Sequence, residues 1–145
     1  MKSMNYSLSI IEKGLLAANT LSAPFGLTLT TQEAAMVAKA KQEAIRESGR
    51  VEFTGGVERE IIRAFSSSPY IEQRTYADTL CELFEIFYAL KNELPDDYPD
   101  GDLITWMEGN FNGRCGGSLD ALQGLNPLEV PEYTEPDPDE EKPDE

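Results

Sequence analysis

The chain has 145 residues, with 12 Lys plus Arg, 27 Asp plus Glu and no His, which gives a formal net charge of −15. This balance disfavours direct binding to nucleic-acid phosphates, because such binding requires clustered cations. The absence of His excludes any mechanism that uses imidazole as a base or as a metal ligand.

The length fits a single domain with one core. No apolar run approaches the roughly 18 to 20 residues that span a bilayer. The first 16 residues lack the continuous apolar region and the cleavage site of a signal peptide. We therefore expect a cytoplasmic protein whose two cysteines, Cys81 and Cys115, are thiols.

Apolar residues recur at intervals of three and four through most of the chain, which predicts an all-α fold. The expected helices cover residues 5–19, 30–48, 57–65, 71–92, 103–112 and a short stretch that begins at residue 119. Residues 22–29 are expected to form a loop. Thr30 and Glu33 match a capping box at the start of the second helix. Ser118 is the expected N-cap of the last helix.

The strongest pattern is an apolar stripe that steps by three and four from Tyr76 to Leu94 and predicts a helix over residues 71–92. It consists of Tyr76, Leu80, Leu83, Phe87, Leu90 and Leu94. Neighbouring apolar residues widen this face, and a helix with so wide an apolar face belongs at the centre of a bundle. We predict a single compact bundle of five to six helices over residues 1–130, with this helix at its centre.

Residues 131–145 differ from the rest of the chain. They hold eight acidic residues, one basic residue and four prolines, a net charge of −7, which leaves −8 for residues 1–130. This composition cannot build a core, so we expect a disordered acidic tail. Two interpretations stay open: the tail aids solubility, or it is an acidic peptide that docks on a basic partner.

The segment from Asp96 to Asp102 lies between two predicted helices and carries the aspartates and the glycine of a calcium loop. The position of the closing bidentate carboxylate is taken by Met107, and Glu108 comes one residue late. We therefore expect a turn and an acidic helix start, and we assign no metal ligand and no cofactor.

Two polar, glycine-rich loops are the remaining candidates for a site. The sequence Gly-Arg-Cys-Gly-Gly-Ser over residues 113–118 precedes a helix and offers backbone N–H groups to an anion. As a nucleophile Cys115 would need a depressed pKa, and no His activates it. The other loop covers residues 50–56, and Arg50 and Glu52 share one face if it is extended. The candidate binding residues are Arg50, Glu52, Arg114, Cys115 and Ser118, and no catalytic residue is assigned.

Several phrases of the sequence occur in a familiar order. They are Gly-Leu-Thr-Leu-Thr over residues 26–30, Gly-Arg-Val-Glu-Phe over 49–53 with Gly-Gly at 55–56, Ser-Pro-Tyr-Ile over 68–71, Phe-Tyr at 87–88 with Lys-Asn-Glu at 91–93, and Gly-x-Cys-x-Gly-Ser-Leu over 113–119. Over about residues 5–125 the chain resembles a family of small bacterial proteins, mainly from anaerobic gut Firmicutes, known only as a domain of unknown function. The resemblance implies a largely helical cytosolic domain, and no activity can be inferred from it.

Three functions stay open, in this order. The first is a non-enzymatic protein-interaction module that uses a helical groove or the tail to bind a protein partner. The second is an acidic inhibitor that imitates nucleic acid and blocks a basic nucleic-acid-binding protein. The third is a small enzyme that uses Cys115 or paired carboxylates.

Overall fold

The computed structural model describes residues 2–48, 57–95 and 97–128, with side chains from residue 8 onward. The predictions for residues 49–56 and 129–145 lie outside the described residues; they include the candidates Arg50 and Glu52 and the acidic tail. In the described part of the chain every regular element is a helix, which confirms the predicted all-α bundle.

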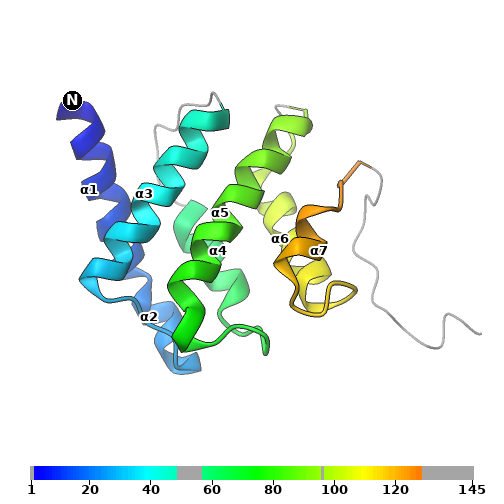
Figure 1. The fold of residues 1–145 in the computed structure, drawn as a ribbon, viewed down its shortest axis with the longest axis horizontal. Coiled ribbons are helices and arrows are strands. Elements are labelled where there is room, and N and C mark those ends of the chain that lie inside the picture. The colour runs from blue at the N-terminus through cyan, green and yellow to red at the C-terminus, as the bar shows by residue number, and fades with distance from the viewer. Residues whose placement is uncertain (1, 49–56, 96, 129–145) are drawn as a thin grey trace, which may run out of the picture.

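The helices form two layers (Figure 1). In the front layer α1 (Lys2–Ala17), α3 (Thr31–Ser48) and α5 (Tyr76–Glu93) lie side by side, and α3 packs on both of its neighbours. Behind them α4 (Val57–Phe65) and α6 (Asp100–Asn112) pack against each other. Because α4 returns behind the front layer, α3 and α5 run in the same direction. The short α7 (Leu119–Gln123) contacts α5 and α6 at one end of the molecule.

The start of α3 follows the predicted capping box. The Thr30 hydroxyl accepts a hydrogen bond from the Glu33 N–H at 3.0 Å, and the Glu33 carboxylate accepts one from the Thr30 N–H at 2.9 Å. These reciprocal bonds satisfy two N–H groups that a helix start would otherwise leave unpaired.

The prediction of a plain loop over residues 22–29 is partly wrong. Residues 19–22 form the short α2 (Asn19–Ser22), and a 3-10 helix, η1 (Ala23–Phe25), follows it. Gly26 then adopts a φ of +84°, which an L side chain rarely allows, and the chain turns away. The Asn19 side chain holds the segment after this turn: its amide oxygen accepts a hydrogen bond from the Leu29 N–H at 2.8 Å, and its amide nitrogen donates one to the Leu29 carbonyl at 3.0 Å.

The central helix begins five residues later than predicted. Glu72 is extended, and residues 73–75 form a 3-10 helix, η2 (Gln73–Thr75), before α5 starts at Tyr76. The Gln73 side chain holds this arrangement, because it bonds both the N–H and the carbonyl of Thr28 at 2.8 and 3.0 Å. A contact between residues 45 positions apart in the chain therefore overrides the local helical pattern.

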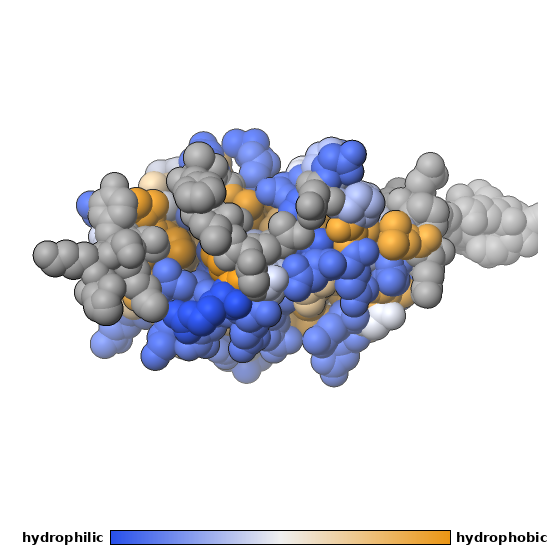
Figure 2. Space-filling view, turned by 90° about the horizontal axis from the view of Figure 1, so that it is seen from above, coloured by the Kyte–Doolittle hydropathy of each residue, from blue (hydrophilic) through white to orange (hydrophobic). Residues whose placement is uncertain are grey.

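The core is centred on α5, as the apolar stripe predicts. Its residues with less than 2% exposure are Tyr76, Leu80, Leu83, Phe84, Phe87 and Tyr88. Buried apolar residues from α1, α3, α4, α6 and α7 join them, and the partly buried Leu21 of α2 packs against this cluster. Seen from above the view of Figure 1, the molecule shows hydrophilic residues along its edges and apolar residues between them (Figure 2). Within the described residues no helix is both long and apolar enough to cross a membrane.

Candidate functional site

The loop over residues 113–118 places its three candidate residues in different surroundings. Arg114 is exposed, whereas the Cys115 side chain is buried. Ser118 is the N-cap of α7, and its hydroxyl accepts a hydrogen bond from the Ala121 N–H at 3.1 Å. The prediction that Ser118 caps the last helix is confirmed.

The backbone N–H groups of this loop donate hydrogen bonds to carbonyls of the loop itself and of α6. Those of residues 115, 116, 117 and 118 donate to the carbonyls of residues 110, 113, 111 and 115, at distances of 2.8 to 3.0 Å. An anion would have to compete with these carbonyls for each N–H group. The geometry therefore favours a closed turn over an anion cradle.

The glycines of the turn serve its packing. Gly117 has a φ of +85°, and a Cβ atom there would lie 2.6 Å from the Cβ atom of Tyr70. The Tyr70 ring meets the Phe111 ring edge-on, with centroids 6.2 Å apart. A side chain at position 117 would push this ring away, so the glycine lets Tyr70 pack closely against the turn.

The thiols are poor candidates for nucleophilic chemistry. Burial raises the pKa of the Cys115 thiol, and the nearby Arg114 lowers that pKa by less. Burial, followed by the charges of Asp78, Glu85 and Glu82, raises the pKa of Cys81 to about 11. Both thiols are therefore protonated at neutral pH, whereas the thiolate is the reactive form.

A lysine of α5 binds the aspartate-rich segment that leads into the first residue of α6. The Lys91 ammonium lies 2.6 Å from the Asp100 carboxylate and donates to the Tyr98 carbonyl at 3.0 Å. Because Lys91 belongs to the last turn of α5, these contacts tie α5 to the start of α6. Among the described residues no cluster of three or more His, Cys, Asp or Glu side chains is placed to hold a metal ion.

A buried ion pair joins α3 to α4. The Lys41 ammonium lies 2.6 Å from a Glu58 carboxylate oxygen, and the two side chains are 1% and 3% exposed. A Cβ atom at Gly14 of α1 would lie 3.1 Å from the other Glu58 oxygen, and the Phe84 ring centroid of α5 is 5.8 Å from the ammonium. Four helices therefore meet at this pair.

Sequence reasoning did not single out this pair, although a signal was present. Lys41 falls on the apolar side of α3, one turn from Val37 and Ala44, and Glu58 precedes the buried Ile61 and Ile62 of α4. A charged residue at an inward position is rarely left unpaired, so the two side chains of opposite sign were candidates for each other.

Five carboxylates gather on the outer side of the front layer, and we call this set the acidic face. It consists of Glu43 and Glu47 on α3 and of Asp78, Glu82 and Glu85 on α5, all of them exposed. The intervals of three and four place each group on one side of its helix. Because α3 packs on α5, the charges of the two groups add up: partial burial, and then the charges of Glu82, Glu47 and Glu43, raise the pKa of Glu85.

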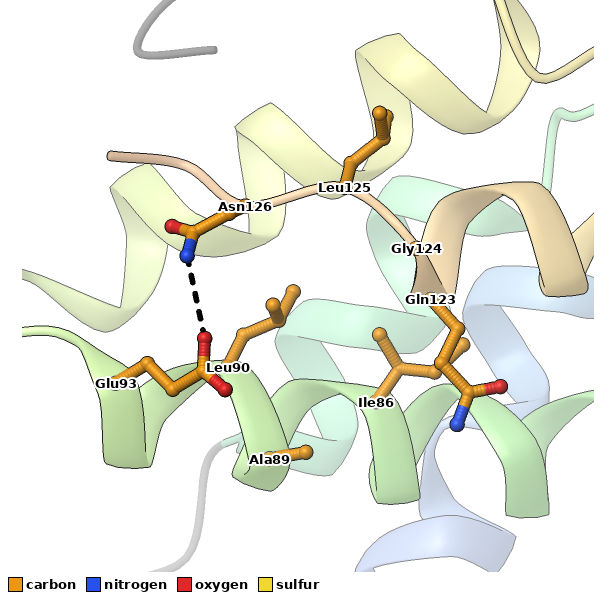
Figure 3. Close-up of a pocket in the computed structure, with 8 residues that line it drawn as sticks. All are labelled: Ile86, Ala89, Leu90, Glu93, Gln123, Gly124, Leu125 and Asn126. Carbon is orange, nitrogen blue, oxygen red and sulfur yellow. Dashed lines mark hydrogen bonds between the residues drawn. The ribbon is translucent and has the colours of Figure 1, made fainter. Parts of the chain in front are cut away.

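A groove of about 320 Å³ opens beside the acidic face, between the second half of α5 and residues 123–126 at and after the end of α7 (Figure 3). Its lining residues are Ile86, Ala89, Leu90 and Glu93 from α5, and Gln123, Gly124, Leu125 and Asn126. The Glu93 carboxylate at one end accepts a hydrogen bond from the Asn126 amide at 3.3 Å.

Comparison with known proteins gives one finding. A family model described as "Family of unknown function (DUF6323)" matches residues 14–130, a range that contains the acidic face, the groove and the 113–118 loop. No curated protein and no solved structure matches the chain. The resemblance to a family of unknown function, predicted from the short phrases, is confirmed at that level.

Proposed function

The chain belongs to this family of unknown function, and we propose that it is a non-enzymatic protein-interaction module that binds a basic protein partner through its acidic face. The observation that carries the proposal is the placement of five exposed carboxylates on α3 and α5, two helices that pack side by side. The raised pKa of Glu85, caused by partial burial and then by the charges of Glu82, Glu47 and Glu43, agrees with this arrangement. Like charges so arranged repel one another and cost stability. A partner with a complementary positive surface relieves that repulsion on binding.

The distribution of charge supports a partner of this sign. Residues 1–130 carry −8 and residues 131–145 carry a further −7, so the domain and the tail attract the same kind of surface. Such attraction accelerates encounter and weakens as salt is added. The raised pKa values of both thiols agree with a binding role, because neither cysteine supplies a thiolate at neutral pH.

Affinity capture from the native host tests the proposal with three full-length proteins. The first is the wild-type chain. The second carries Glu43→Gln, Glu47→Gln, Glu82→Gln and Glu85→Gln. The third is a control with the same change in net charge, made by Glu12→Gln, Glu60→Gln, Glu72→Gln and Asp102→Asn. Circular dichroism establishes that all three fold alike.

We expect the wild-type chain and the control to retain a basic partner and the acidic-face variant to lose it. Equal capture by the acidic-face variant and the control would show that only net charge matters and would refute a role for this face. A further full-length variant, with the eight acids of residues 131–145 replaced by their amides, separates the contribution of the tail from that of the face.

Imitation of nucleic acid is the second candidate, and the rows of carboxylates along two adjacent helices favour it. In this case the basic partner is a nucleic-acid-binding protein, and duplex DNA competes with the chain for it. We expect a DNA duplex to displace the captured partner if imitation is correct. Displacement by salt alone, without competition by DNA, would leave the general interaction module and exclude imitation. For either candidate we further propose a bacterial cytoplasmic protein from the Firmicutes, as the resemblance in the sequence implies.

A further inference from the structure

The groove beside α7 has a small apolar base and a charged end. Ile86 and Leu90 of α5, which are 3% and 5% exposed, form the base with the exposed Ala89, and Glu93 and Asn126 stand at one end (Figure 3). A volume of about 320 Å³ is at the lower limit for a small-molecule pocket. It matches the size of one or two side chains rather than that of a large ligand.

The electrostatics of the groove favour a cation. Two helices end beside it, since Glu93 is the last residue of the 18-residue α5 and Gln123 is the last residue of α7. Helix C-termini carry partial negative charge, and the Glu93 carboxylate adds a full one. None of the eight lining residues is basic.

The groove also adjoins the acidic face, because both lie on α5. Glu82 and Glu85 of the acidic face lie within one or two helical turns of Ile86 and Ala89 of the groove. A single basic segment that crosses α5 would therefore meet both features.

We propose that this groove receives a lysine or arginine side chain of the basic partner, an inference that rests on the proposed function. The aliphatic part of the basic side chain packs on Ala89 and on the small exposed parts of Ile86 and Leu90, and its charged end reaches Glu93. Long basic side chains bury their methylene groups along apolar surface in this way while the charge stays in a polar setting. The acidic face attracts the partner, and the groove anchors it.

The chain's own tail fits the groove poorly. Residues 131–145 carry a net charge of −7 and one lysine, Lys142. Insertion of that segment would bring carboxylates toward Glu93 and toward the ends of two helices, where like charge is unfavourable. The charge of the groove therefore points to a basic segment from another protein.

A synthetic basic peptide of Leu, Lys and Arg residues serves as the probe, and a neutral peptide with norleucine and citrulline in place of Lys and Arg serves as its control. Binding to the full chain is measured at low salt, and amide-resonance mapping by NMR locates the contact. Two variants are compared with wild type: Ala89→Arg, which places a competing cation in the groove, and Ala17→Arg, the same change at the exposed end of α1.

We expect the basic peptide to shift the resonances of residues 86–93 and 123–126 and the neutral peptide to leave them unchanged. Ala89→Arg should weaken binding about tenfold, whereas Ala17→Arg should change it less than about twofold. Equal effects of the two variants, with shifts confined to the acidic face, would overturn the groove and leave the proposed function standing. No binding of the basic peptide at low salt would overturn the groove, whereas the proposed function is judged separately by the capture of its partner.

Discussion

Removal of one member of the buried pair between Lys41 and Glu58 should be far more damaging than removal of both. Each side chain is almost completely buried and its charge is satisfied by the other across 2.6 Å. The variants Lys41→Met and Glu58→Gln each leave one charged side chain facing a neutral partner. The double variant Lys41→Met with Glu58→Leu removes both members of the pair together.

The magnitude follows from the distance and the burial. At 2.6 Å and an effective dielectric constant of about 20, the attraction is about 6 kcal/mol. The cost of taking each ion out of water is several kcal/mol, which offsets most of that attraction. Breaking a buried pair on one side therefore costs about 3–5 kcal/mol, whereas replacing both members with apolar residues changes stability by about 1 kcal/mol or raises it.

Equilibrium unfolding in urea, followed by circular dichroism, measures the effect. A domain of this size has a free energy of unfolding of about 5–15 kcal/mol, so a loss of 3–5 kcal/mol is readily resolved. We expect both single variants to unfold at much lower urea concentrations and the double variant to recover most of the loss. Single variants that each lose less than about 1 kcal/mol would refute the argument that each of these buried charges requires the other as its partner.

Three further predictions follow from individual residues. The pKa of Glu85 is raised in the folded state, so the folded protein gains less from ionisation and its free energy of unfolding falls as pH rises through the Glu85 titration. Glu85→Gln should therefore stabilise the protein at pH 7 by about 0.5 kcal/mol at low salt and by less at high salt, because salt screens the repulsion from Glu82, Glu47 and Glu43 and leaves the cost of partial burial. Gly117→Ala should cost about 2–4 kcal/mol in urea unfolding through its left-handed backbone and its clash with Tyr70, whereas Gly116→Ala, with open space around it, should cost only about 1–2 kcal/mol, and equal losses would contradict this account. With a pKa of about 11, Cys81 should react with iodoacetamide at pH 8 at least about tenfold more slowly than a free model thiol, since its greater nucleophilicity offsets only part of the lost thiolate.

Local patterns were sufficient to predict the helices and the centre of the core. The stripe on α5 predicts a central helix because its apolar intervals hold for five steps, and the capping box predicts the start of α3 because both of its bonds are made within four residues. The start of α5 was misplaced because the bonds of Gln73 reach back to Thr28. No local pattern reports such a contact.

The site was harder to predict than the fold, because it depends on which helix faces lie next to each other. Glu47 and Glu85 are 38 positions apart, and only the packing of α3 on α5 brings their charges close enough to interact. The same holds for the groove, where Glu93 meets Asn126 across 33 positions. The loop candidates Arg114, Cys115 and Ser118 were chosen for their residue types, and the structure gives Ser118 a structural part as the cap of α7.

The affinity of the captured basic partner for the wild-type chain and for the acidic-face variant tests the central claim most directly. The dissociation constant is measured at low and at physiological salt, with the control of equal net charge beside both. We expect neutralisation of the acidic face to weaken binding at least about tenfold and to flatten its dependence on salt, because each lost charge pair contributes on the order of 1 kcal/mol or less and several are lost together. A dissociation constant that stays within about twofold of the control would contradict the account.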